Sequence, residues 1–105
     1  MNPPYINRCT LQGRIVSQPT TKSISERTKI TTFQLVLVES WRNAQGDQGE
    51  HKNRVTIEVV GRDSARAAEE AACGRWASVE GYIRTGIFKG QEITKVRTLT
   101  IDIWG

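Results

Sequence analysis

Apolar and polar residues alternate with a period of two near the start of the chain, across residues 5–17. Small and apolar residues occupy one face of this run, namely Cys9, Leu11, Gly13 and Ile15. Polar residues occupy the other face, namely Arg8, Thr10, Gln12 and Arg14. One apolar and one polar face are typical of a half-buried strand in an antiparallel sheet, and the glycine within the run indicates a bulge or sharp bend.

Four later segments also have the character of strands, namely residues 30–41, 54–61, 76–84 and 96–104. Each places apolar residues on one face, and in the last segment these are Leu99, Ile101 and Ile103. Residues 30–41 differ because Val36 and Val38 make the second face apolar as well. A strand that is apolar on both faces is expected to be covered on both, which predicts a contact between subunits.

Two of the connecting segments are polar. Residues 18–28 are expected to form a polar connection without regular structure. Residues 42–53 contain Gly46 and Gly49 but no large apolar side chain. This composition predicts a long, mobile hairpin loop between the second and third strands.

An alanine-rich segment, residues 64–73, predicts a short helix, with Asp63 or Ser64 as its cap and Gly74 at its end. The expected order is therefore three strands, a helix and two strands. This is the order of the OB-fold, an all-β, five-stranded Greek-key barrel in which a helix closes one end. A five-stranded sandwich is the alternative, but it leaves the helix unexplained. The 105 residues are expected to form one domain, 1–105.

The composition narrows the classes of protein without selecting one. Fifteen Lys and Arg residues against 11 Asp and Glu residues give a net charge of +4, which suits a nucleic-acid partner. The sequence has no apolar stretch near the roughly 20 residues of a membrane span and no signal-peptide core, so a cytoplasmic protein is expected. Both cysteines, Cys9 and Cys73, are expected to be reduced core thiols.

The sequence does not point to catalysis, to a metal or to a cofactor. The single histidine, His51, is expected to be solvated, and a CxxC pair is missing, which argues against structural zinc. Four carboxylates are spread singly over different strands, where most are expected to be exposed: Glu39, Glu58, Glu80 and Asp102. Without a nucleophile–base pair or metal-ligand spacing, an enzyme is not expected, and an OB-fold nuclease is the weakest alternative.

Four segments together resemble the bacterial single-stranded DNA-binding protein family: NRCTLQGRI, ESWRNAQG, RVTIEVVGR and WASVEGYIRTG. They occur in the family's order and at nearly its spacing over almost the whole chain. The resemblance implies an OB-fold that binds single-stranded DNA with little sequence preference, in replication, recombination or repair. It also implies a homo-oligomer, commonly a tetramer. Because the sequence ends at Trp104-Gly105 without the family's linker and acidic tail, either a truncated protein or a tailless member is expected.

The resemblance also indicates which residues contact DNA. Trp41 and Phe88 match base-stacking aromatic positions, the second with Phe in place of Trp. The matching basic positions along the path of the DNA strand are Arg8, Lys22 and Arg84. Three positions depart from the family's pattern, with Arg54 in place of a tryptophan, Val60 in place of an aromatic residue and Val55 in place of a histidine at a subunit contact.

The residues themselves add further candidates, because five cations lie on strands or a hairpin beside the expected groove: Arg54, Arg84, Lys89, Lys95 and Arg97. Single strands are held by stacking rings and a cationic groove, since every base has a π-face and every linkage a charge. The guanidinium of Arg54 can stack on a base in place of the missing ring. Each cation is also open to the simpler interpretation of a solubilising surface charge.

Phe88 is the most informative of these residues, because it lies in a segment with little to pack against, between Gly86 and Gly90. We predict that it lies in the loop at the tip of a hairpin and stacks on a base. The alternative is that its ring packs on its own barrel or on another subunit. Trp76 is expected to close one end of the barrel, and Trp104 is expected at an interface or in packing.

Two other functional interpretations stay open. A protein-interaction module, such as a primosomal accessory subunit with weak single-strand binding, is favoured by the lost aromatic positions and disfavoured by Trp41 and Phe88. RNA is a possible ligand in place of DNA. Replication proteins are further expected partners, and a membrane is not. At least a dimer is expected, because the first strand of such a barrel has a free edge that can pair with a second copy.

Overall fold

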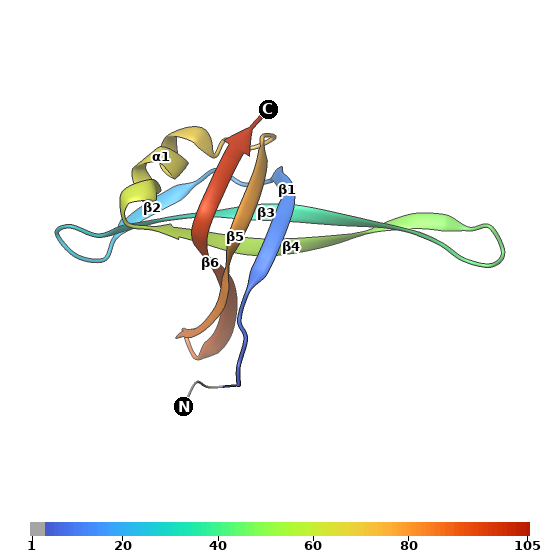
Figure 1. Ribbon diagram of the computed structural model, residues 1–105, viewed down its shortest axis with the longest axis horizontal. Coiled ribbons are helices and arrows are strands. Elements are labelled where there is room, and N and C mark those ends of the chain that lie inside the picture. The colour runs from blue at the N-terminus through green and yellow to red at the C-terminus, as the bar shows by residue number, and fades with distance from the viewer. Residues whose placement is uncertain (1–3) are drawn as a thin grey trace.

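The computed structural model describes residues 4–105. In these residues, six strands and one helix follow one another in the order β1 (Cys9–Ile15), β2 (Thr20–Ser23), β3 (Lys29–Arg42), β4 (Gln48–Val60), α1 (Arg62–Glu70), β5 (Trp76–Phe88) and β6 (Gln91–Trp104). Figure 1 shows a small barrel from which two long hairpins project in different directions.

The strands form one closed sheet. Their order is β1-β5-β6-β4-β3-β2, and the sheet closes because β1 also pairs with β3. Neighbouring strands are antiparallel except β4 and β6, which run parallel. Because β2 is attached to the edge of β3, the closed barrel itself consists of β1, β3, β4, β5 and β6. A closed five-stranded barrel with one helix between its third and fourth strands confirms the predicted OB-fold.

The sequence does not predict β2, which lies within the expected polar connection. Its four residues pair with β3, from Thr20 opposite Thr32 to Ser23 opposite Lys29, and all four are exposed. A strand without a buried face has no apolar alternation, so nothing in the pattern marks it.

The core lies inside the barrel and under the helix. It is formed by the inward-facing residues of every barrel strand together with two alanines of and after the helix: Ile15, Phe33, Leu35, Ile57, Val59, Ala67, Ala71, Ala77, Val79, Val96 and Ile101. The alternation predicted for β1, β3, β4 and β5 is therefore confirmed on its buried side. The small side chains of Ala67 and Ala71 let the helix segment approach the barrel closely.

The ends of the helix differ from the prediction. Its N-cap is Gly61, with no side-chain cap among the described residues, and Ser64 lies inside the helix. The Ser64 hydroxyl shares a 2.7 Å hydrogen bond with the hydroxyl of Thr31, which fastens the helix to β3. The helix ends at Glu70, four residues before Gly74, whose backbone N–H donates to the carbonyl of Ile15 at 2.8 Å. Gly74 therefore does not end the helix; it lies in the segment that leads into β5 and is bonded to the end of β1.

Gly13 has a different role from the predicted bulge. The register of β1 against β5 passes through Gly13 without a break, with Gly13 opposite Ala77. A Cβ at this position would collide with the carbonyl oxygen of Val36. The glycine is needed because the backbones of β1 and β3 approach each other closely where the barrel closes.

A bulge does occur, but between β5 and β6. Glu80 lies opposite Thr100 and Gly81 opposite Thr98, so Leu99 has no partner and the alternation reverses there. Leu99 is 61% exposed, and the prediction that it shares an inward face with Ile101 is wrong. The close approach of β5 and β6 at the bulge also explains why residue 81 is a glycine, because a Cβ there would collide with the carbonyl oxygen of Arg97.

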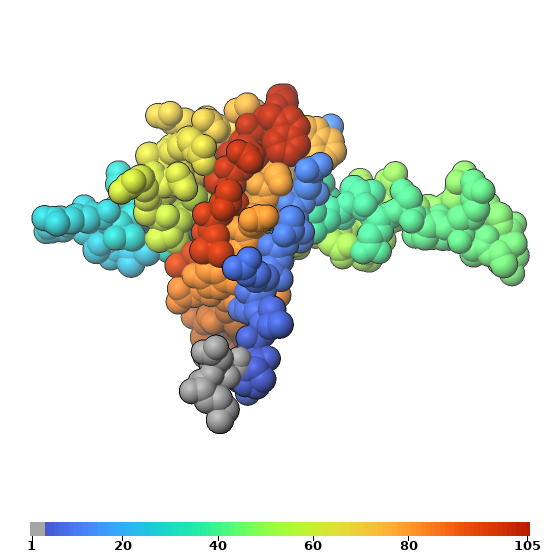
Figure 2. Space-filling view, in the orientation of Figure 1, coloured from blue at the N-terminus to red at the C-terminus, as the bar shows by residue number. Residues whose placement is uncertain are grey.

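Both long hairpins extend beyond the barrel, further than predicted. The ladder of β3 and β4 continues to Arg42 opposite Gln48, so the expected loop of residues 42–53 is only residues 43–47. We call residues 38–52 the β3–β4 arm and residues 83–94 the β5–β6 arm. The radius of gyration is 15.9 Å, against about 13 Å for a compact domain of this length, because both arms protrude, as Figure 2 shows.

Candidate nucleic-acid interface

The β5–β6 arm ends in a tight turn that sets the position of Phe88. The ladder runs to Phe88 opposite Gln91, so Phe88 is the last residue of β5 and not a loop residue as predicted. Lys89 and Gly90 form the connection with φ angles of 51° and 77°. Two consecutive residues with positive φ match the type I′ geometry that suits the twist of a hairpin. The turn therefore holds the ring on one defined side of the arm.

The outer face of β5 and β6 gathers the predicted cations around that ring. Arg84 lies opposite Lys95, and Tyr82 lies opposite Arg97. Directly opposed residues in an antiparallel pair point to the same side of the sheet, and every second residue of a strand shares that side. Phe88, Arg84, Lys95 and Arg97 therefore project from one face.

An open groove lies along this face. Its lining includes five of the residues predicted to contact DNA, together with one carboxylate: Lys22, Arg84, Phe88, Lys95, Arg97 and Glu58. We call it the basic groove. Its residues come from β2, β4, β5 and β6, so the fold brings together positions from most of the chain length.

Phe88 lies open to solvent within this groove. The residue is 58% exposed and is not part of the barrel core. The Lys89 ammonium lies 5.4 Å from the ring centroid, which is within cation–π range. The ring is thus held at the end of a strand, beside a cation, with its surface available to a ligand.

The root of the β5–β6 arm is braced by the segment before β1. The side chain of Asn7 donates to the carbonyl of Ile83 and accepts from its backbone N–H, both at 2.8 Å. This pair of bonds ties the chain to β5 two positions beyond the last ladder pair, Cys9 opposite Gly81. It restrains the arm at the point where it leaves the barrel.

Trp41 lies on the other arm, outside the basic groove. It is opposite Gly49 in the ladder, and a Cβ at Gly49 would lie 2.6 Å from Trp41 Cζ2, so the indole covers the glycine backbone. The ring is 50% exposed. By alternation it belongs to the side of β3 that carries Phe33 and Leu35, whereas Arg54 belongs to the opposite side.

Arg54 and Arg8 also lie away from the basic groove lining. Arg54 is exposed opposite Val36 and contributes to a second hollow, which also includes Arg14 and Trp76. There the Arg14 guanidinium lies 4.8 Å from the Trp76 ring centroid. Arg8 is exposed just before β1, in a small hollow near Glu80 and Leu99. The nine predicted contact residues therefore do not form one patch.

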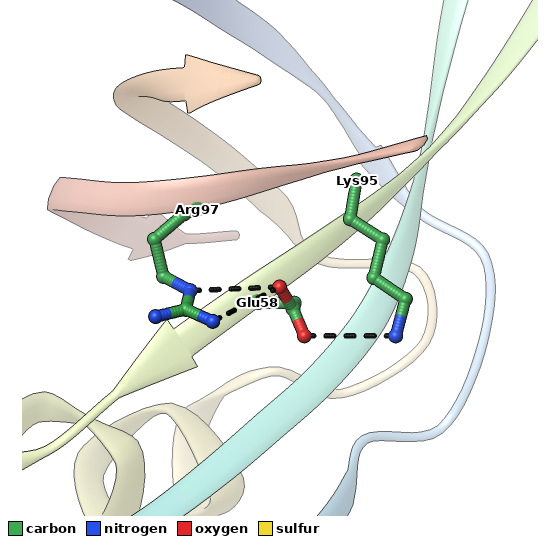
Figure 3. Close-up of polar contacts among 3 residues, drawn as sticks. All are labelled: Glu58, Lys95 and Arg97. Atoms are coloured by element: carbon green, nitrogen blue, oxygen red, sulfur yellow. Dashed lines mark hydrogen bonds and ion pairs between the residues drawn. The ribbon is translucent and has the colours of Figure 1, made fainter. Parts of the chain in front are cut away.

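Glu58 is the residue that sequence reasoning missed. The alternation in β4 correctly predicts that it points outward, but it is only 8% exposed and not an exposed strand position. Figure 3 shows its carboxylate between Lys95 and Arg97. The burial follows from the parallel pairing of Glu58 with Arg97, which the pattern along β4 alone does not reveal.

Other expectations concern cysteines, metals and membranes. Cys9 and Cys73 are both free, but Cys73 is exposed and so is not a core thiol. Residues 4–105 contain no group of three or more His, Cys, Asp or Glu side chains arranged to hold a metal ion. The helix found in these residues is neither long nor apolar enough to cross a membrane.

Comparison with known proteins identifies the class of protein. Residues 6–103 match the single-strand binding protein family, and the chain belongs to this family. It is similar in structure to the Plasmodium falciparum SSB in complex with ssDNA, with a TM-score of 0.80, 22% identity, and coverage of 99% of this chain and 97% of that one.

Two bacterial proteins are also similar. For the single-stranded DNA-binding protein of Thermus aquaticus the TM-score is 0.80 and the identity 17%, over 95% of this chain and 50% of that chain. This chain therefore spans about half the length of the Thermus aquaticus protein. For the small single-stranded DNA-binding protein of Streptomyces coelicolor the TM-score is 0.66 and the identity 18%, over 90% of this chain and 91% of that one.

Proposed function

We propose that the protein binds single-stranded DNA with little sequence specificity and protects or organises it in replication, recombination or repair. Membership of the single-strand binding protein family supports this proposal. The observation that carries it is the basic groove, in which an exposed ring, Phe88, shares one face with Lys22, Arg84 and Arg97. A ring can stack on any base and a cation can meet any phosphate, so such a groove binds single strands without reading their sequence.

Binding is proposed to need no metal or nucleotide cofactor. The family is a DNA-binding family without enzymatic activity, and we extend that description to this chain. A cytoplasmic, nucleoid-associated localisation and contacts with replication proteins are further parts of the proposal.

The test is a titration of fluorescent oligo(dT) and of a duplex of matched length, followed by anisotropy. We expect much tighter binding of oligo(dT) than of duplex, in the presence of a chelator. Equal affinity for the two would contradict the proposal. Tight partner binding with negligible oligo(dT) binding would favour a protein-interaction module instead, and a preference for oligo(rU) over oligo(dU) would favour RNA.

We also propose that the protein is a homo-oligomer, either a dimer or a tetramer. In the described chain, residues 9–13 of β1 pair with β5 alone, and of the residues of β1 only Arg14 and Ile15 pair with β3. The other edge of β1 is therefore free to add a strand from a second copy. On β3, Val38 is 50% exposed, which gives apolar surface for a contact. Light scattering should return a multiple of 11.8 kDa, and a monomer mass at micromolar concentration would contradict this.

A further inference from the structure

The basic groove contains a nearly buried carboxylate among its cations. Glu58 lies on the outer face of β4, beside Arg97 of β6, and is 8% exposed. A groove that receives a polyanion would be expected to exclude negative charge, because like charges close together repel. The proposed function alone therefore does not explain why a carboxylate lies in this groove.

The carboxylate is shared between two cations. The Lys95 ammonium lies 3.5 Å from Glu58 Oε2, and Arg97 Nε lies 3.5 Å from Glu58 Oε1, to which Arg97 Nη2 donates a 3.5 Å hydrogen bond (Figure 3). One carboxylate and two cations leave a cluster with a charge of +1 where Lys95 and Arg97 alone would give +2. The three side chains are 11–36% exposed, so salt screens this pairing less than it would on an open surface.

The pairing leaves hydrogen-bonding capacity unused. Close contacts between charged nitrogen and carboxylate oxygen are about 2.7–2.9 Å long, so contacts of 3.5 Å are loose. Within the described residues, Arg97 Nε is buried without a hydrogen-bond partner. The arrangement neutralises charge without fixing both cations in close bonds, and a phosphate oxygen entering the groove would offer a second anionic partner to the same groups.

We propose that Glu58 is an internal counter-anion that competes with nucleic-acid phosphates for Lys95 and Arg97, and so limits the affinity and the salt dependence of the basic groove. This inference rests on the proposed binding of single-stranded DNA. Glu58 weakens binding in two ways, by occupying the cations and by repelling the incoming phosphate. A positioning role, in which Glu58 holds both cations ready for DNA, would need closer bonds and makes the opposite prediction.

The central test is Glu58→Gln, which keeps the shape of the side chain and one acceptor oxygen but removes its charge. We expect oligo(dT) binding about threefold to tenfold tighter at low salt. The slope of log K against log salt should become steeper by about 0.7, equivalent to one more phosphate neutralised, so the gain should shrink as salt rises. Weaker or unchanged binding by the folded variant would overturn the proposal.

Glu69→Gln is the matched control, because it removes the same charge from an exposed position on α1. This substitution changes the net charge of the protein by the same amount as Glu58→Gln, but Glu69 lies outside the lining of the basic groove. We expect less than a twofold change in affinity. An equal gain in both variants would show that only net charge matters and would also overturn the proposal.

A second measurement does not depend on the folding of a Glu58 variant. In the otherwise unchanged protein, Lys95→Met should reduce the salt slope by clearly less than about 0.7, the value for one free phosphate contact, because Lys95 is already paired with Glu58. A reduction by the full value would contradict the proposal. A third measurement does use the Glu58 variant: in the Glu58→Gln background, Lys95→Met should weaken binding at least threefold more than it does in the original chain.

The outcomes separate this inference from the proposed function. If the unmodified protein does not bind oligo(dT), the proposed function fails, and the competition proposal fails with it. If the unmodified protein binds but Glu58→Gln brings no gain, only the role of Glu58 is wrong.

Discussion

Strands β5 and β6 run through both the barrel and the β5–β6 arm, but their side chains follow different rules in the two parts. In the barrel half of β5, Ala77, Val79 and Gly81 are buried at every second position. In the arm half, residues 83–88 are all exposed. Side-chain packing therefore specifies the first half, whereas backbone pairing and the turn specify the second. A segment without core contacts is free to carry side chains chosen for a ligand.

Strands β3 and β4 also have a packed barrel part and an exposed arm, but the arm carries a different set of side chains. Beyond the barrel it carries carboxylates such as Glu39 and Glu50 beside cations such as Lys52, and its exposed ring is Trp41. The β5–β6 arm instead rises from the basic groove, next to Lys22 and Arg97. Mutations should therefore divide into barrel changes that affect stability and arm changes that affect binding, with the β5–β6 arm more sensitive than the β3–β4 arm.

The largest expected effect is in the barrel, at Phe33. This ring is 1% exposed in the core, so Phe33→Ala should lower the free energy of unfolding by about 3–5 kcal/mol through lost burial and a cavity. Urea denaturation followed by fluorescence measures this. Oligo(dT) affinity, measured where the variant is still folded, should stay close to the original. If Phe33→Ala weakened binding without lowering stability, the proposed division between barrel residues for stability and arm residues for binding would be wrong.

The next largest effect is expected at Phe88, where, in contrast to Phe33, binding should be lost and stability kept. Phe88→Ala should weaken oligo(dT) binding by about 1–3 kcal/mol, the contribution of one stacked base, and should barely change the melting temperature. Phe88→Tyr is the control, because it keeps the ring and should keep most of the affinity. A Phe88→Ala protein that melts much lower but binds normally when folded would show that the ring serves the fold.

Trp41→Ala compares the two arms directly. Because Trp41 lies outside the basic groove, we expect it to weaken oligo(dT) binding by about 1 kcal/mol, at the low end of the stacking range. Trp41→Phe, which keeps a ring over Gly49, should retain most of the affinity that Trp41→Ala loses. Anisotropy titrations of the Trp41 and Phe88 variants under one salt condition give the ranking. A larger loss for Trp41→Ala than for Phe88→Ala would make the β3–β4 arm the main contact.

The sequence predicts the barrel better than the arms, for a physical reason. Buried positions impose alternation, which is why the segments around Phe33, Ile57 and Val79 are found as strands. Exposed ladders impose none, so residues 42–53 look like a loop although most of them are paired. Leu99 is misplaced because the bulge depends on how closely Gly81 approaches Arg97, which is a contact between strands.

The same limit applies to the candidate site. Sequence comparison and charge select Phe88, Arg84, Lys95 and Arg97, and the register places these residues on one face. Their separation from Trp41 could not be foreseen, because it depends on how far each hairpin extends beyond the barrel. The burial of Glu58 depends on the parallel pairing of β4 with β6, which joins residues 39 positions apart.

The smallest expected effect concerns the turn of the β5–β6 arm. Lys89 has a φ of 51° and precedes Gly90, so Lys89→Asn removes the charge while giving the Asn-Gly sequence that this type of turn favours. The melting temperature should therefore stay the same or rise slightly. The salt slope of oligo(dT) binding should fall by about 0.7, because one phosphate contact is lost. Lys29→Asn, at the exposed start of β3 and outside the lining of the groove, is the control and should leave the slope unchanged. An unchanged slope for Lys89→Asn would show that Lys89 is a solvated charge beside the Phe88 ring and does not meet the DNA.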